Sequence, residues 1–148
     1  MTLIEIQKLL TGMISGILKI DFNSGNSHAS KSLEVKHDLT VQIMLYEGDQ
    51  AWIIFLDVPA EKFNNACQVI YGDQLNNDAY TLEFANTIAG NLTRSFEENT
   101  RISLPYVLKT SSGLSLSTLN HDDFHTLPLQ SPQLGMQLII CSYEIIPF

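Results

Sequence analysis

The hydrophobic pattern changes its period along this chain, and that change is the feature that most restricts its fold. Over residues 3–20, leucine, isoleucine and methionine recur every three or four positions, as in an amphipathic helix. Over residues 33–45, apolar residues alternate with mostly polar ones, as in a half-buried strand. The two periods predict helices and a sheet that share one core.

Further strands are predicted after this first one. The turn residue Gly48 separates residues 33–45 from the apolar run 51–58, so the two strands are expected to form an antiparallel hairpin. Residues 21–32 are polar and rich in serine and asparagine, which predicts a loop. The C-terminal half contains four short runs of strand character, at 102–108, 113–119, 126–130 and 136–146.

Two more helices are expected between the hairpin and these runs. Pro59 is a good helix start and Gly72 a good helix end, which predicts a helix between them. Residues 78–98 have the strongest helical period in the chain. The order helix, hairpin, two helices and several strands predicts an α+β fold in which the helices pack on a mainly antiparallel sheet.

Length and charge limit the function classes. With 148 residues, of which 45% are hydrophobic, the chain is expected to form a single domain, residues 1–148. A net charge of −8 argues against nucleic acid as a ligand, because phosphate backbones are bound by clustered Lys and Arg. The chain begins without a basic leader, and its apolar runs are too short to cross a bilayer. We therefore expect a cytoplasmic protein that does not bind membranes.

The helix predicted at 78–98 has two different faces. At about 100° per residue, one arc is apolar and is expected to face the core. That arc contains Leu82, Ala85, Ala89, Leu92 and Phe96, with Ile88 at its margin. The opposite arc carries Glu83 and Asn86, three positions apart, and Gly90 one turn further on. Glu83 and Asn86 are therefore predicted to point into solvent together.

The sequence around this pair resembles a known family. Residues 82–107 read LEFANTIAGNLTRSFEENTRISLPYV, in which Glu83 and Asn86 are followed by Gly90-Asn91 and by the strand 102–107. This string is similar to the signature of the CheX branch of the CheC, CheX and FliY chemotaxis phosphatases. In that signature, Glu-x-x-Asn precedes Gly-Asn and a strand of the form Ile-Ser-x-Pro-x-Val.

The resemblance implies a phosphatase that hydrolyses the aspartyl phosphate of a CheY-like receiver domain. Asn86 would place the attacking water, and Glu83 would pair with the receiver's lysine. The protein would need no cofactor of its own, because the receiver supplies Mg²⁺. The chain departs from the family at Ala79, where Asp or Ser is usual, and at Tyr106, where Thr is frequent. A non-catalytic CheX-like binding or scaffold module is therefore the alternative.

The resemblance also implies a homodimer, because CheX proteins pair across a sheet edge. Residues 113–119 and 136–146 are apolar, rich in strand-forming residues and free of the lysines that commonly protect an exposed edge. These two runs are the expected edge strands.

Two other clusters could have carried chemistry. His121 and His125 flank Asp122 and Asp123, which suggests a metal site, but the isolated His28 and His37 supply no third ligand group. We therefore expect no metal. Cys67 and Cys141 lie in apolar segments without metal or redox spacing, which predicts buried free thiols.

Overall fold

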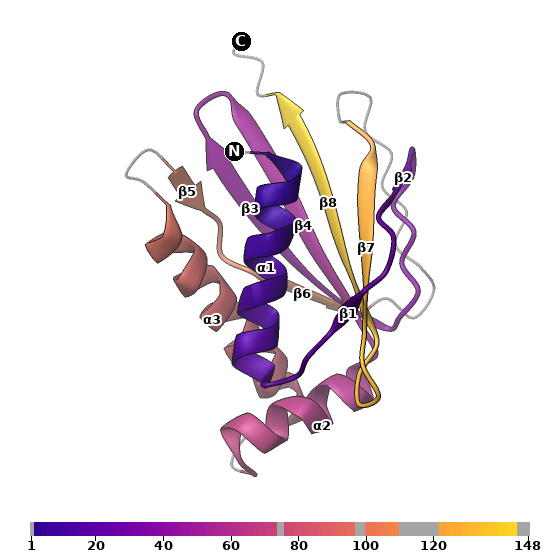
Figure 1. Ribbon diagram of the computed structural model, residues 1–148. Helices are drawn as coiled ribbons and strands as arrows, with labels where there is room; N and C mark the ends of the chain where they lie inside the picture. Colours follow the sequence, from indigo (N-terminus) through magenta and orange to yellow (C-terminus); the bar gives the residue numbers. More distant parts are fainter. Residues whose placement is uncertain (1, 74–75, 97–99, 110–121, 145–148) are drawn as a thin grey trace.

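A computed structural model describes residues 2–73, 76–96, 100–109 and 122–144 of the chain. These residues form an α+β fold, in which three helices pack on an eight-stranded antiparallel sheet (Figure 1). The predicted fold class is confirmed. The helices are α1 (Leu3–Leu18), α2 (Ala60–Tyr71) and α3 (Asn77–Ser95). The strands are β1 (Asn23–Ser24), β2 (His28–Ser30), β3 (Leu39–Glu47), β4 (Gln50–Val58), β5 (Thr100–Ile102), β6 (Tyr106–Lys109), β7 (Phe124–Gln130) and β8 (Met136–Glu144).

The sheet is centred on the β3–β4 hairpin, which confirms the predicted pair. Its strands run in the order β1, β7, β8, β4, β3, β5, while β2 also pairs with β7 and β6 with β3. The hairpin register runs from Leu39 opposite Val58 to Glu47 opposite Gln50. Gly48 has a φ of 60°, in the left-handed region that glycine adopts at no steric cost, and so allows the tight turn.

The first hairpin strand is shorter than predicted, since it begins at Leu39 rather than at residue 33. The reason is a buried carboxylate on β4. Asp57 accepts hydrogen bonds from the backbone N–H groups of Lys36, at 2.7 Å, and His37, at 2.9 Å, and from the Gln137 side chain at 2.9 Å. These two N–H groups donate to a side chain and not to the backbone of a neighbouring strand. Residues 36 and 37 therefore do not extend β3.

Two further predictions about the strands are wrong in part. Residues 21–32 contain the short strands β1 and β2, both paired with β7. Their side chains are almost all exposed, so no apolar alternation marks them. The predicted strand 102–108 is split into β5 and β6, and both pieces pair with β3.

The expectation that residues 136–146 form an edge strand is also wrong. β8 pairs with β4 on one side and with β7 on the other. Its apolar residues are buried on both faces of the sheet: Leu138 and Ile140 pack in the main core, and Ile139 and Cys141 in a smaller cluster. β8 therefore lacks lysine because it is buried at the centre of the sheet, and not because it is an unprotected edge. The other expected edge run, residues 113–119, lies outside the described residues.

The main core lies between the helices and one face of the sheet. α1 and α3 cover that face, and α2 lies across one end of it (Figure 1). α1 starts with a capping box, in which the Thr2 and Glu5 side chains each accept from the other residue's backbone N–H. α2 begins after Pro59, and the Asp38 carboxylate caps it by accepting from the N–H of Ala60 at 2.8 Å. No helix in the described ranges is long and apolar enough to span a membrane.

Candidate functional site

Helix α3, which carries the predicted site residues, is held firmly at its N-terminal half. The Asn76 side chain caps it by accepting from the N–H of Ala79 at 2.9 Å. The ring of Phe84 packs edge-on against Phe63 of α2, with ring centroids 4.9 Å apart. The Tyr80 hydroxyl donates to the carbonyl of Gly72, just after α2. Side chains on the outer face of α3 are therefore presented by a rigid support.

The rotation of α3 differs from the predicted one. Its buried residues are Tyr80, Thr81, Phe84, Ala85, Ile88 and Leu92. Leu82, which was expected in the core, is 49% exposed, and Ile88, which was expected at the margin, is fully buried. The cause is the packing of α2 against α3 at Phe84. This contact buries the side of α3 that carries Phe84 and leaves Leu82 at the surface. Ala85 and Leu92 lie in the core as predicted.

Glu83 and Asn86 are both exposed on α3, as predicted. The two residues lie three positions apart on α3, so their side chains are neighbours on adjacent turns. Within the described ranges, neither the Glu83 carboxylate nor the Asn86 carboxamide has a hydrogen-bond or ion-pair partner. Both polar groups are free to contact another molecule, while their chemical role remains a prediction.

A tyrosine that the sequence pattern did not single out borders this pair. The Tyr71 hydroxyl at the end of α2 lies 3.4 Å from Oγ1 of Thr87, which itself donates to the Glu83 carbonyl at 2.8 Å. Burial raises the pKa of Tyr71, the hydrogen bond with Thr87 opposes part of this increase, and the negative charge of Glu83 adds a smaller increase. The phenol therefore stays protonated beside Glu83. The packing of α2 on α3 brings the Tyr71 hydroxyl close to Glu83. The hydrophobic periodicity of the sequence could not predict this position, because it depends on a contact between two helices.

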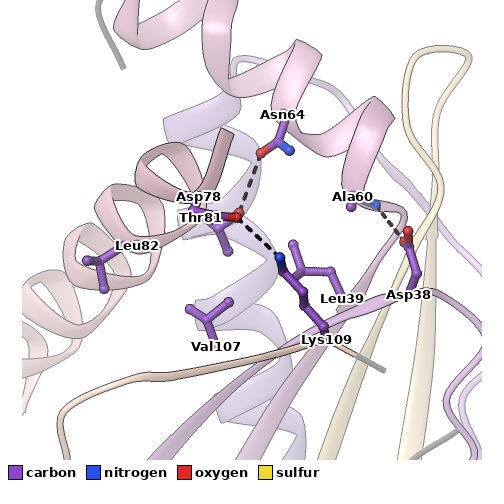
Figure 2. A pocket seen from close by; sticks show the side chains of 9 residues that line it. All are labelled: Asp38, Leu39, Ala60, Asn64, Asp78, Thr81, Leu82, Val107 and Lys109. Carbon is purple, nitrogen blue, oxygen red and sulfur yellow. Dashed lines mark hydrogen bonds and ion pairs between the residues drawn. The ribbon is translucent and has the colours of Figure 1, made fainter. Parts of the chain in front are cut away.

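A pocket of about 640 Å³ borders the other flank of α3 (Figure 2). Leu82 of α3 and Val107 of β6 lie at one end of it, and Asp38 and Ala60 at the other. On its rim, the Lys109 ammonium lies 3.9 Å from the Asp78 carboxylate, and both side chains are largely exposed. Leu82 is four positions from Asn86, so the pocket opens next to the candidate pair.

The strand that follows α3 is shaped by Ser103. Its hydroxyl accepts from the N–H of Met44 at 2.9 Å, and its own N–H donates to the Met44 carbonyl at 2.9 Å. The side chain thus replaces a ladder hydrogen bond where the chain passes from β5 to β6. The Ile-Ser-x-Pro part of the signature therefore has a structural role, because it keeps this broken edge attached to β3 beside α3.

Two further positions of the signature bear on function. Gly90 lies four positions after Asn86, and no heavy atom lies within 4 Å of the point where a Cβ would be. Packing within the chain therefore does not require glycine, which costs about 1 kcal/mol relative to alanine inside a helix. Ala79, at the position where Asp or Ser is often found in the family that the sequence resembles, is half-buried on the turn before Glu83 and has no polar side chain.

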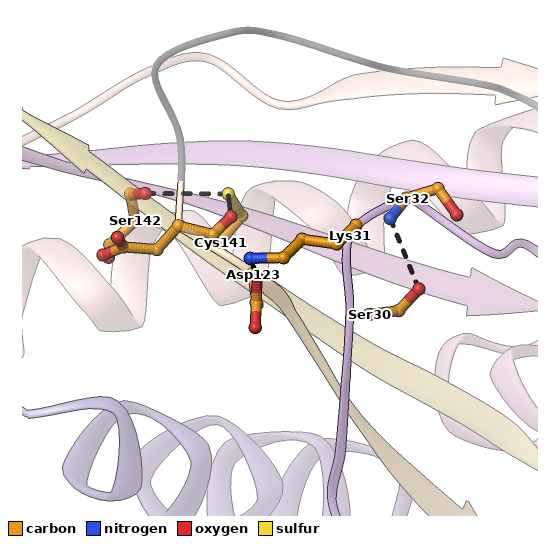
Figure 3. A network of polar contacts seen from close by, with 7 residues as sticks. Ser30, Lys31, Ser32, Asp123, Cys141 and Ser142 are labelled. Atoms are coloured by element: carbon orange, nitrogen blue, oxygen red, sulfur yellow. Dashed lines mark hydrogen bonds and ion pairs between the residues drawn. The ribbon is translucent and has the colours of Figure 1, made fainter.

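The competing acidic cluster is engaged in contacts of its own (Figure 3). The Lys31 ammonium lies 2.5 Å from the Asp123 carboxylate, and the Ser142 hydroxyl donates to Asp122 at 2.7 Å. His125 lies on β7 rather than in a loop, and His121 lies outside the described residues. In the ranges that the structure describes, no three His, Cys, Asp or Glu side chains are grouped so that they could hold a metal ion.

Both cysteines are buried, as predicted. Burial raises the pKa of the Cys67 thiol to about 12 and that of Cys141 to about 11, the latter with added effect from Asp122 and Asp123. Both groups are protonated at neutral pH and are poor nucleophiles.

The fold is that of the CheC and CheX chemotaxis proteins. No protein-family model matches the chain, and no curated protein matches it in sequence. Among solved structures, a chain of the CheX–CheY–BeF₃–Mg²⁺ complex from Borrelia burgdorferi is 14% identical, with a TM-score of 0.72 over 97% of this chain and 99% of that one. A CheC-like protein from Shewanella sp. PV-4 is 12% identical, with a TM-score of 0.71 over 96% and 99% of the two chains. CheX from Desulfovibrio desulfuricans is 14% identical, with a TM-score of 0.67 over 92% and 95%. The resemblance expected from residues 82–107 is confirmed as a shared fold.

Proposed function

We propose that this protein is a phosphatase for the aspartyl phosphate of a CheY-like receiver domain. The observation that carries the proposal is the placement of Glu83 and Asn86, both exposed and neither bound to another described residue, on the outer face of a helix that packing holds in place. The fold supports it, because one of the similar structures is a complex of CheX with CheY.

Asn86 is assigned the positioning of the attacking water. An aspartyl phosphate is already a reactive acyl phosphate, so hydrolysis depends mainly on placing water in line with the phosphorus. The carboxamide of Asn86 can accept a hydrogen bond from that water and donate one toward a phosphoryl oxygen. It needs no shifted pKa for this task, which is consistent with a site on an exposed helix face.

Glu83 is assigned an anchoring role. Its carboxylate, one turn before Asn86, would pair with the lysine beside the receiver's phosphoryl group and so orient α3 over the phosphate. The protein supplies no cofactor in this scheme. The receiver brings the Mg²⁺ that neutralises the phosphoryl oxygens, and the described residues contribute only positioning groups. A cytoplasmic location belongs to the same proposal, because receiver domains act there.

A non-catalytic scaffold is the second candidate, and Ala79 is the observation that favours it. A polar side chain at this position could assist Glu83 or the receiver, and alanine cannot. The scaffold function predicts that the protein binds the phosphorylated receiver without changing the lifetime of its phosphate.

One experiment separates the two candidates. Candidate receivers are phosphorylated with a small-molecule phosphodonor, the donor is removed, and loss of phosphate is followed with and without the protein. The phosphatase proposal expects faster loss for at least one receiver. Binding to a receiver activated by beryllofluoride and Mg²⁺, with no faster loss of phosphate, supports the scaffold.

We also propose a homodimer formed through a sheet edge. β8 lies at the centre of the sheet and does not support this. The support is the resemblance to CheX proteins and the apolar, lysine-free sequence of residues 113–119. Sedimentation equilibrium at micromolar concentration is expected to give twice the chain mass of 16.6 kDa. A monomer throughout the concentration range would contradict the dimer and leave the phosphatase proposal standing, because Glu83 and Asn86 lie in one subunit.

A further inference from the structure

A second pocket, of about 340 Å³, lies where the end of α1 meets α2 (Figure 1). The apolar residues that line it are Leu18, Ile20, Ala66, Val69 and Ile70. None of its described lining residues belongs to α3. This pocket is therefore separate from the candidate pair, and the proposed function makes no use of it.

The pocket carries positive charge in a strongly acidic protein. The chain has 16 acidic and 8 basic side chains, yet Lys19 and Lys62 line this pocket and no described Asp or Glu does. Asp21 and Glu61 are close to these lysines in sequence but are not among the lining residues. Within the described ranges, neither lysine has an ion-pair partner. Two unpaired ammonium groups beside an apolar floor match a ligand that has a negative charge and an apolar body.

The backbone holds Lys19 in a conformation that lysine seldom adopts. Lys19 ends α1 with φ of 54° and ψ of 42°, and it is the only residue other than glycine with a positive φ in the described ranges. Glycine is the usual residue at such a helix end, because it has no Cβ and so avoids the steric cost. The Ser15 carbonyl fixes this corner by accepting from the N–H groups of Lys19 and Ile20. A lysine fixed where glycine would fit better is consistent with a role for its side chain.

The size of the pocket favours a small molecule over a protein as its occupant. Its volume is at the lower end of the range of about 300 to 1,000 Å³ that is usual for small-ligand sites. A protein partner would cover about 800 Å² around an apolar centre. Val69, at 84% exposure, is the only large hydrophobic residue on the described lining that is exposed, so the surface around the pocket offers no such centre.

We propose that the pocket between α1 and α2 binds a small amphipathic anion, a molecule with one anionic group on a short aliphatic chain. The anionic group lies beside Lys19 and Lys62. The chain packs against Leu18, Ala66 and Val69. This inference goes beyond the proposed function and does not depend on it.

Titration calorimetry of the full chain with octanoate tests this proposal. Two further compounds separate the two parts of the ligand, because acetate keeps the charge without the chain and octylamine keeps the chain with the opposite charge. Octanoate is expected to bind at least about tenfold more tightly than either compound, since the site recognises both parts.

Variants of the two lysines test the positive charge. Lys19→Gly and Lys62→Gln each remove one ammonium group and should weaken octanoate binding at least about fivefold. Lys19→Gly is expected to melt no lower than the wild type, because glycine adopts a φ of 54° at no steric cost. Weaker binding by this variant therefore cannot result from unfolding.

A third variant, Val69→Asp, adds a negative charge to the lining and should weaken binding to a similar extent. The chain provides matched controls on α1. Lys8→Gln makes the lysine change, and Ile4→Asp the aliphatic change, at exposed residues that do not line the pocket. Both controls are expected to bind octanoate like the wild type.

Four results would overturn the inference. They are no binding of octanoate by the wild type, equal affinity for octanoate and octylamine, unchanged binding by both Lys19→Gly and Lys62→Gln, and equal weakening by Lys8→Gln. None of them bears on the proposed function, which is tested with phosphorylated receivers and concerns residues of α3.

Discussion

Leu82 and Leu92 are the same residue type on the same helix, yet Leu82 is 49% exposed and Leu92 is fully buried. Leu92 packs in the core between α3 and the sheet, whereas Leu82 lines a pocket at the surface. Glu83 and Asn86 lie on the outer side with Leu82. The two faces of α3 are therefore expected to differ in what a mutation changes: stability on the inner face, and binding or turnover on the outer face.

The largest effect is expected on the inner face. Leu92→Ala leaves a cavity in a packed core and should lower the free energy of unfolding by about 2 to 5 kcal/mol. Urea denaturation of wild type and variant measures this difference. A midpoint close to the wild-type value would mean that Leu92 does not face the core.

Asn86→Ala should have the next largest effect, and only on activity. Loss of the carboxamide removes the group that orients water, so the rate of receiver dephosphorylation at saturating receiver should fall about 100-fold. The melting temperature should stay at the wild-type value, because the side chain is exposed and makes no described hydrogen bond. Full activity in this folded variant would contradict the assigned role.

Glu83→Ala tests whether Glu83 and Asn86 have different roles on the outer face of α3. Loss of the anchoring carboxylate should raise the apparent KM for phosphorylated receiver about tenfold, with a smaller decrease in kcat. Steady-state kinetics over a range of receiver concentrations separates the two constants. A decrease in kcat with no change in KM would argue against anchoring.

Leu82→Ala should have a much smaller effect on stability than Leu92→Ala. Half of this side chain is already in water, so its truncation should cost less than about 1 kcal/mol. Run beside Leu92→Ala in the same urea series, it compares one chemical change on two faces. Equal losses in the free energy of unfolding for the two variants would contradict the difference in burial between the two faces of α3.

Sequence pattern predicted the elements of this fold better than their mutual orientation. The period of residues 78–98 correctly indicated a helix with Glu83 and Asn86 exposed, because that signal is local. It placed Leu82 and Leu92 on one apolar arc, although they lie about 80° apart around the axis. The actual core direction depends on the contact of Phe63 with Phe84, which joins two helices and has no periodic signature.

The sheet shows the same limit. The hairpin at Gly48 followed from local turn chemistry. The position of β8 could not be predicted in this way. A strand buried on both faces and an unprotected edge strand can have the same apolar composition. Likewise, Asp57 reads as an ordinary polar residue in the sequence, and only the fold places it under the N–H groups of Lys36 and His37. Tyr71 and the pocket beside Leu82 were missed because both are formed by contacts between elements.

The most direct test of the central claim is multiple turnover. A phosphorylated receiver, freed of phosphodonor, is mixed with this protein at one-twentieth of the receiver concentration, and the remaining aspartyl phosphate is followed over time. Catalysis at the outer face of α3 predicts that all of the phosphate is lost faster than in receiver alone, at a rate proportional to the protein added. Loss at the same rate as in receiver alone, for every receiver that the protein binds, would contradict the account and identify a binding module.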